Sequence, residues 1–134
     1  MPTLKCQYKG QLRTELTHLQ SGNTLITDAP IDNHGKGESF SPTDTVAGVL
    51  SSCMMTIMGI VAEREQLDMT GLSAEITKVM AADPRRIAEI KIDFSWPACP
   101  ATEKQREKLK RAALTCPVAL SLHADVFQNV NFDF

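Results

Sequence analysis

The chain has 134 residues, of which 43% are hydrophobic and 22% are charged, and its formal net charge is -2. This length and composition are typical of one globular domain, so we expect residues 1–134 to form a single domain. The weak negative charge gives no electrostatic reason to expect binding to nucleic acid or to an anionic membrane. The first ten residues lack the apolar core of a signal peptide, which predicts a cytoplasmic protein with reduced cysteines.

Three short strands are predicted in the first part of the chain. Apolar and polar residues alternate over residues 4–8 and again over residues 12–17, as in half-buried strands. The second of these strands places Arg13 on the face opposite its leucines. A third strand is predicted over residues 24–27. The polar segment that follows, residues 28–40, is predicted to be a loop of the kind that often lines a site.

The most distinctive stretch is residues 41–65, which reads SPTDTVAGVLSSCMMTIMGIVAERE. Ser41 can cap a helix that begins at Pro42, and Asp44 completes a capping box. One helical stripe runs through Val46, Leu50, Cys53, Ile57 and Ile60. Other apolar residues widen this stripe to most of the circumference, which predicts a helix buried in the middle of the domain. A membrane span is the less favoured interpretation, because glycine, serine and threonine dilute the run.

The second half of the chain is predicted to contain three strands and one amphipathic helix. Alternation predicts strands over residues 72–80 and 88–94, and a last strand over residues 126–134. Thr102 can cap a helix whose charged face is exposed to solvent. The order of elements indicates an α+β domain with largely antiparallel sheets around the long buried helix.

Cys53 has two interpretations. A lone cysteine on an apolar helix commonly fills the core as a small hydrophobic residue. A nucleophilic role requires a lowered thiol pKa. The helix dipole does not supply it, because Cys53 lies about 16 Å along the axis from Pro42 and the dipole acts within the first turn. A cation from elsewhere is required, and Arg13 is a candidate, although a solvated strand residue is the simpler interpretation of its position.

Cys116 is followed by Pro117, which can open a short helix with Cys116 at its N-terminus. Packing and reactivity are both open for this thiol. Cys53 and Cys116 could form an attacking and resolving pair if their Cα atoms lie within about 7 Å. Cys6 and Cys99 are interpreted as packing residues. His34 and His123 match no compact zinc pattern, so no metal site is expected.

The helix segment and the Cys116-Pro117-Val118 segment together resemble the OsmC-like family, which contains OsmC and the organic hydroperoxide resistance proteins. In that family a proline opens the long helix and the first active cysteine follows eleven residues later, as Cys53 follows Pro42. The second cysteine lies in a CPV-type segment. The segments DNHGKGESFSP, ADPRRIAEI and CPVALSLHAD are similar to an uncharacterised branch of the family, so the resemblance covers nearly the whole chain.

The resemblance implies an intertwined α+β homodimer and a cofactor-free thiol peroxidase for organic hydroperoxides. Cys53 would be the nucleophile and Cys116 the resolving cysteine, and a dithiol of the lipoyl type would reduce the resulting disulfide. The family also implies that Arg13 stabilises the thiolate and that an acid on the helix orients Arg13. Family peroxidases carry a glutamate directly after the proline, where this chain has Thr43, so Asp44 is the candidate for that acid.

The Thr43 departure and the methionine-rich helix leave a second function open. A small-molecule-binding or redox-sensing dimer would share the fold but would turn over no peroxide. The two functions differ in whether peroxide produces a reversible disulfide between Cys53 and Cys116. A third interpretation, both cysteines as core residues, predicts thiols that do not react in the folded protein.

Overall fold

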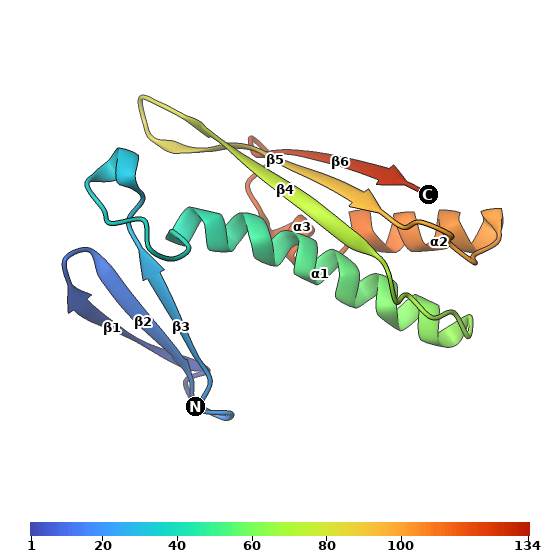
Figure 1. Cartoon of the computed structure of the whole chain (residues 1–134), viewed down its shortest axis with the longest axis horizontal. Helices are drawn as coiled ribbons and strands as arrows, with labels where there is room; N and C mark the ends of the chain where they lie inside the picture. The colour runs from blue at the N-terminus through green and yellow to red at the C-terminus, as the bar shows by residue number, and fades with distance from the viewer. The chain divides into compact units, whose positions relative to one another are not determined.

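The computed structural model describes residues 1–134, which divide into two compact units, residues 1–46 and residues 47–134. Figure 1 shows the elements in chain order. They are β1 (Leu4–Gly10), β2 (Arg13–His18), β3 (Thr24–Asp28), the 3-10 turn η1 (Ile31–Asn33), α1 (Pro42–Arg64), β4 (Ser73–Ala81), β5 (Arg86–Ser95), α2 (Glu103–Leu114), α3 (Pro117–Ser121) and β6 (Phe127–Asp133). The predicted α+β class is confirmed.

The first unit contains an antiparallel sheet in the order β1-β2-β3. The three predicted strands are present, but the second begins one residue later than predicted. Leu12 has a positive φ of 63°, as do Gln11 at 54° and Gly10 at 89°, so these residues form the tight turn between β1 and β2. Alternation alone therefore counted a turn residue as part of a strand.

The loop between β3 and α1 is held by its own backbone. The Asp28 N–H donates to the Phe40 carbonyl at 2.9 Å, and the Gly37 N–H donates to the Ala29 carbonyl at 3.2 Å. Gly35 packs directly on Ala29, because a Cβ at Gly35 would lie 1.8 Å from the Ala29 oxygen. The predicted loop is thus a compact segment whose two ends are joined.

Helix α1 begins as the sequence predicts. The Ser41 hydroxyl accepts a hydrogen bond from the Asp44 N–H at 3.0 Å, and the Asp44 carboxylate accepts one from the Ser41 N–H at 2.9 Å. These two bonds form the reciprocal capping box. The buried side of the helix differs from the predicted stripe. It is formed by Ala47, Leu50, Ser51, Met54, Met58 and Ala62.

The second unit contains a sheet in the order β4-β5-β6 with three helices. β4 and β5 are antiparallel, whereas β5 and β6 are parallel, with α2 and α3 in the connection between them. A parallel pair needs such a crossover, and helices commonly supply it. The Thr102 capping box at the start of α2 and the short helix opened by Pro117 both match the sequence predictions.

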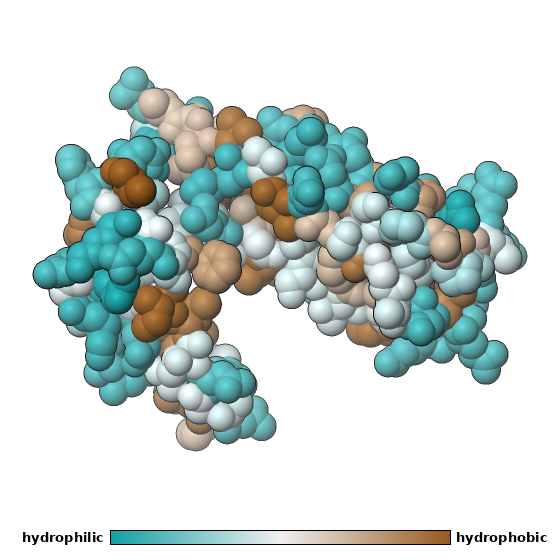
Figure 2. All heavy atoms as spheres, viewed as in Figure 1, coloured by the Kyte–Doolittle hydropathy of each residue, from teal (hydrophilic) through white to brown (hydrophobic).

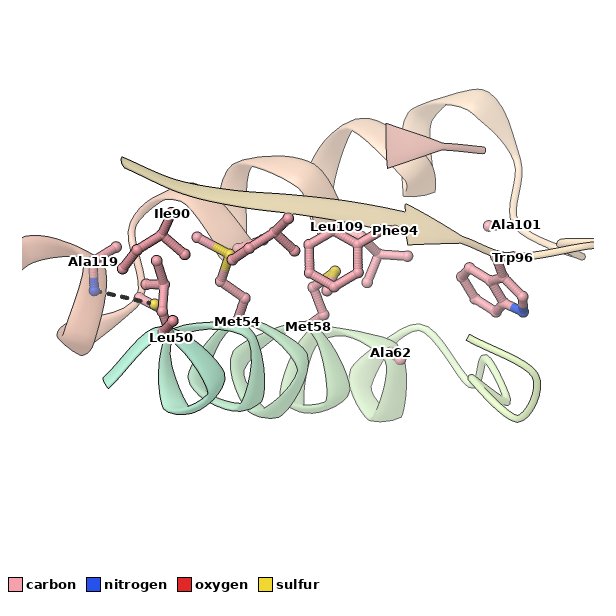
Figure 3. Close-up of a cluster of buried hydrophobic side chains, with 14 residues drawn as sticks. Leu50, Met54, Met58, Ala62, Ile90, Phe94, Trp96, Ala101, Leu109 and Ala119 are labelled. Carbon is pink, nitrogen blue, oxygen red and sulfur yellow. Dashed lines mark hydrogen bonds between the residues drawn. The ribbon is translucent and has the colours of Figure 1, made fainter. Parts of the chain in front are cut away.

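One hydrophobic core lies in the second unit (Figure 3). Leu50, Met54 and Met58 of α1 point toward the β5 side chains Ile90 and Phe94, as Figure 3 shows. All five of these side chains are at most 1% exposed. Helix α1 is long and apolar enough to cross a membrane, but its packing against β5 identifies it as a core helix of the domain.

Two apolar surfaces remain exposed in the single chain. On α1, Val49 is 44% exposed and Ile60 is 43% exposed. On the first sheet, Leu4 of β1 and Leu25 of β3 are 50% and 37% exposed, and Tyr8 is 67% exposed. Figure 2 shows brown, hydrophobic side chains that reach the surface among hydrophilic ones. Exposed apolar surfaces of this kind are uncommon on monomeric proteins when they are large and contiguous.

Candidate functional site

The second unit brings Cys53 and Cys116 together. Cys53 lies on α1 and is half-buried, and Cys116 is the N-cap residue of α3 and is fully buried. The two side chains are close enough for a hydrogen bond with Cys53 to raise the pKa of the Cys116 thiol. Both cysteines are free thiols. We call these two residues the thiol pair.

The environment of Cys116 keeps its thiol protonated. Burial raises the pKa of Cys116, and the neighbouring Cys53 side chain raises it further. The Ala119 N–H acts in the opposite direction by donating to the Cys116 sulfur at 3.4 Å, the contact drawn as a dashed line in Figure 3. Because the raising effects are larger, Cys116 remains a thiol at neutral pH and can donate its S–H to a neighbouring sulfur.

The two members of the thiol pair differ in how a ligand can reach them. Cys116 has no exposed surface, whereas Cys53 is partly exposed on the helix. A reagent from solvent therefore meets Cys53 first. Chemically, this arrangement suits an attacking sulfur at Cys53 and a second sulfur that reacts only with its neighbour.

In the first unit, Arg13 lies at the centre of a charged cluster. Its Nε donates to Asp28 Oδ1 at 2.7 Å, and its Nη2 donates to Asp28 Oδ2 at 2.8 Å. Nη2 also reaches Glu38 Oε2 at 3.5 Å. We call Arg13, Asp28 and Glu38 the arginine cluster. Its bidentate pair fixes the plane of the guanidinium group.

Asp28 is the buried member of the arginine cluster, with only 1% of its side chain exposed. The hydrogen bond from Arg13 is the main cause that lowers the pKa of Asp28, and burial opposes it. The Glu38 N–H adds a hydrogen bond to Asp28 Oδ2 at 3.2 Å. Asp28 is therefore ionised at neutral pH, and the Arg13 Nη1 group stays available for another acceptor, since the contacts in the cluster use only Nε and Nη2.

Asp44, the acid predicted to orient Arg13, completes the capping box of α1 through its contacts with Ser41. The carboxylates that contact Arg13 are Asp28 and Glu38. An orienting role for Asp44 stays a prediction.

The sequence patterns did not single out Asp28 or Glu38. Asp28 directly faces Arg13 across the β2–β3 pair, so the sheet register contains the information. The predicted third strand ended one residue before Asp28, which assigned this residue to the loop. Glu38 gave no comparable signal, because its position depends on how the loop closes.

Two of the three histidines, His34 and His123, were considered as metal ligands. His34 ends the η1 turn with a φ of 66°, and the His123 ring accepts a hydrogen bond from the Asp125 N–H at 3.0 Å. No group of three or more histidine, cysteine or acidic side chains is arranged to hold a metal ion.

Comparison with known proteins gives a consistent family assignment. The family model described as OsmC-like protein matches residues 35–130. No curated protein matches the chain. A Psychrobacter arcticus 273-4 protein described as an osmotic stress induced and detoxification response protein is 52% identical to this chain, and its crystal structure matches with a TM-score of 0.94. That match covers 98% of this chain and 96% of the other.

Two more distant structures share the fold. An organic hydroperoxide resistance protein OsmC from Legionella pneumophila has a TM-score of 0.75 at 14% identity, covering 100% of this chain and 98% of the other. An organic hydroperoxide resistance protein from Elizabethkingia anophelis has a TM-score of 0.69 at 10% identity, covering 98% and 96%. The family match over most of the chain and the 52% identical structure lead to one conclusion: the chain belongs to the OsmC-like family.

Proposed function

We propose that the chain is a thiol-dependent peroxidase that reduces organic hydroperoxides. The observation that carries this proposal is the thiol pair, in which a partly exposed Cys53 lies beside a fully buried and protonated Cys116. Distant structures that share the fold include proteins described as organic hydroperoxide resistance proteins. These descriptions support organic hydroperoxides as the proposed substrate class, and the thiol pair supports the proposed chemistry.

The reaction would proceed in three steps. The Cys53 thiolate attacks the terminal oxygen of the hydroperoxide, an S–O bond replaces the O–O bond, and the alkoxide leaves and takes up a proton as the alcohol. The Cys116 sulfur then attacks the Cys53 sulfenic acid, which forms a disulfide and releases water. A dithiol of the lipoyl type returns two electrons by thiol exchange and becomes a disulfide itself.

The substrate preference would follow from the helix that carries Cys53. The neighbours of Cys53 on α1 are mainly apolar, and partly buried Met55, Ile57 and Val61 pack against the same core. Alkyl groups gain about 0.8 kcal/mol for each methylene that leaves water. An alkyl hydroperoxide would therefore react faster than hydrogen peroxide.

In this proposal, Arg13 stabilises the Cys53 thiolate and Asp44 keeps the orienting role that the family resemblance implies. The arginine cluster adds a refinement. Asp28 and Glu38 hold one edge of the guanidinium group, which leaves Nη1 for an oxygen or a sulfur. Asp28 would thus be a positioning residue for Arg13.

We further propose that the active protein is a cytoplasmic homodimer in which residues 1–134 act as a single OsmC-like domain. The first unit has an exposed sheet and no hydrophobic core of its own, and three strands need a covered face to be stable. A second copy would cover this sheet and the exposed side of α1 that carries Val49 and Ile60. Symmetric dimers are the commonest way to bury such faces.

The test measures consumption of cumene hydroperoxide and of hydrogen peroxide with dihydrolipoamide as the reductant. Cys53→Ser should abolish turnover. Cys116→Ser should allow one oxidation and then accumulate a sulfenic acid that dimedone traps. Cys99→Ser is the matched control, since Cys99 is a half-buried cysteine of the same unit, and it should retain the wild-type rate.

Equal rates in the wild type and in all three variants would exclude the peroxidase. A ligand-binding dimer would instead show no disulfide in the intact mass after peroxide treatment. Unreactive thiols in the folded protein would assign both cysteines to the core. Intact-mass spectra recorded before and after peroxide and dithiol separate these outcomes.

A further inference from the structure

An open cavity of about 390 Å³ lies where the last turn of α1 meets the second half of α2. Every residue that lines it belongs to the second unit. The lining consists of Val61, Arg64, Glu65, Lys108, Arg111, Ala112 and Thr115. Three cationic side chains therefore surround the cavity, against one carboxylate, in a protein whose net charge is negative. We call it the basic cavity.

Only one of the three cations in the basic cavity has an ionic partner. Lys108 Nζ lies 2.9 Å from Glu65 Oε1. The guanidinium groups of Arg64 and Arg111 make no hydrogen bond or ion pair with another side chain. Arg64 and Arg111 are both exposed, so solvent weakens their mutual repulsion, and an anion between them would turn it into attraction. Two arginines without ionic partners line the same cavity, and an anion bound there could pair with both of them.

A structural role at the helix ends does not account for both arginines. Basic residues near a helix C-terminus commonly interact with its free carbonyls. Here the chain supplies its own donors to these carbonyls. The Leu67 N–H donates to the Ala62 carbonyl at 2.8 Å, and the Thr115 hydroxyl donates to the Arg111 carbonyl at 3.0 Å. The arginine side chains are therefore not needed as caps.

We propose that the basic cavity binds the phosphate group of a small molecule. Arginine matches phosphate with two parallel N–H donors, and Lys108 adds a point charge that can shift from Glu65. Val61 and Ala112 provide an apolar part of the lining that could contact the organic portion of a phosphate ester. Neither member of the thiol pair lines the cavity, so this site is independent of the proposed peroxidase reaction.

The experiment titrates the full chain with inorganic phosphate and with phenyl phosphate by isothermal calorimetry, at low ionic strength held constant with chloride. Each probe should bind at one site per chain. The double variant Arg64→Gln/Arg111→Gln should weaken binding at least tenfold, because both bidentate donors are lost. Lys104→Gln is the matched control, because it removes a positive charge from α2 outside the cavity, and its affinity should stay within twofold of the wild type.

The two probes distinguish the sources of the phosphate. Tighter binding of phenyl phosphate would identify an ester as the ligand, and equal binding would identify the free anion. The proposal is overturned if neither probe binds saturably, or if Lys104→Gln weakens binding as much as the double arginine variant does. Amide spectra recorded by NMR for each variant verify that the fold is retained, and only residues around the cavity should shift when the probe is added.

Discussion

The two units of the chain are stabilised in different ways. All 14 buried hydrophobic residues lie in residues 47–134, where α1, β5 and α2 meet. In residues 1–46 the buried residues are polar, namely Thr27, Asp28 and Ser41. The second unit therefore carries the hydrophobic driving force. The first unit depends on the hydrogen bonds of its sheet, on the arginine cluster and on the second copy that is proposed to cover its exposed face.

The largest expected effect is in the core of the second unit. Leu109 has no exposed surface, and Leu109→Ala should lower the free energy of unfolding by about 2–5 kcal/mol through lost burial and a residual cavity. Leu120→Ala is the control, since Leu120 is in the same unit and is 72% exposed, and it should cost under about 0.5 kcal/mol. Urea unfolding monitored by Trp96 fluorescence measures both. Similar losses in the two variants would contradict the location of the core.

The next largest effect is expected for a substitution on the first sheet, which tests whether a second copy covers it. Leu25 is 37% exposed in the single chain, but in the proposed homodimer it would be buried. Leu25→Asp should then weaken dimerisation at least 100-fold, which corresponds to about 2.7 kcal/mol. Sedimentation velocity across a range of concentrations measures the dissociation constant. Leu120→Asp is the matched control, and if it weakens the dimer equally, the interface does not lie on this sheet.

The sequence predicted most elements because each carried a local signal. The capping boxes at Ser41 and Thr102, and the proline after Cys116, fixed three helix starts by rules that act within four residues. The buried side of α1 was less predictable. A helix that is apolar on most sides offers several stripes of similar hydrophobicity, and tertiary packing selected the one through Met54 and Met58.

The candidate site also has a part that local sequence patterns predict and a part that depends on the tertiary fold. Cys53 and Cys116 were found because their local contexts are distinctive, and only folding shows that their side chains meet across 62 intervening residues. The partners of Arg13 depend on the register of β2 with β3 and on the closure of a loop, which no local pattern specifies. The contacts between residues distant in sequence are therefore the part of the site that the sequence did not predict.

A smaller effect concerns Asp28, the buried carboxylate of the first unit. Its pKa is lowered in the folded state, so its stabilising contribution is complete above the unfolded pKa of about 3.9 and is lost as the pH falls through the folded value. Asp28→Asn should lower the melting temperature at pH 7. Below a pH of about 3, the melting temperatures of the variant and the wild type should be closer together. Thermal melts from pH 2 to pH 8 measure this.

The same variant tests whether Asp28 positions Arg13. Asp28→Asn should slow alkylation of Cys53 at pH 7 at least tenfold, if Arg13 stabilises the thiolate. Glu38→Gln should slow it less, because Glu38 reaches Arg13 at 3.5 Å and is 62% exposed. If Arg13→Lys slows alkylation but Asp28→Asn does not, the positioning role is wrong. If neither variant changes the alkylation rate, Arg13 does not stabilise the Cys53 thiolate.

The smallest effect is expected at the ion pair between Lys108 and Glu65, on the surface of the second unit. Lys108 is 43% exposed and Glu65 is 26% exposed, so solvent screens the pair despite its 2.9 Å separation. Lys108→Gln should lower the free energy of unfolding by less than about 1 kcal/mol, and the difference should vanish in 1 M salt. Urea unfolding at two salt concentrations measures it. A loss as large as that of Leu109→Ala would mean that ionic contacts between α2 and the end of α1, rather than the core, hold the second unit together.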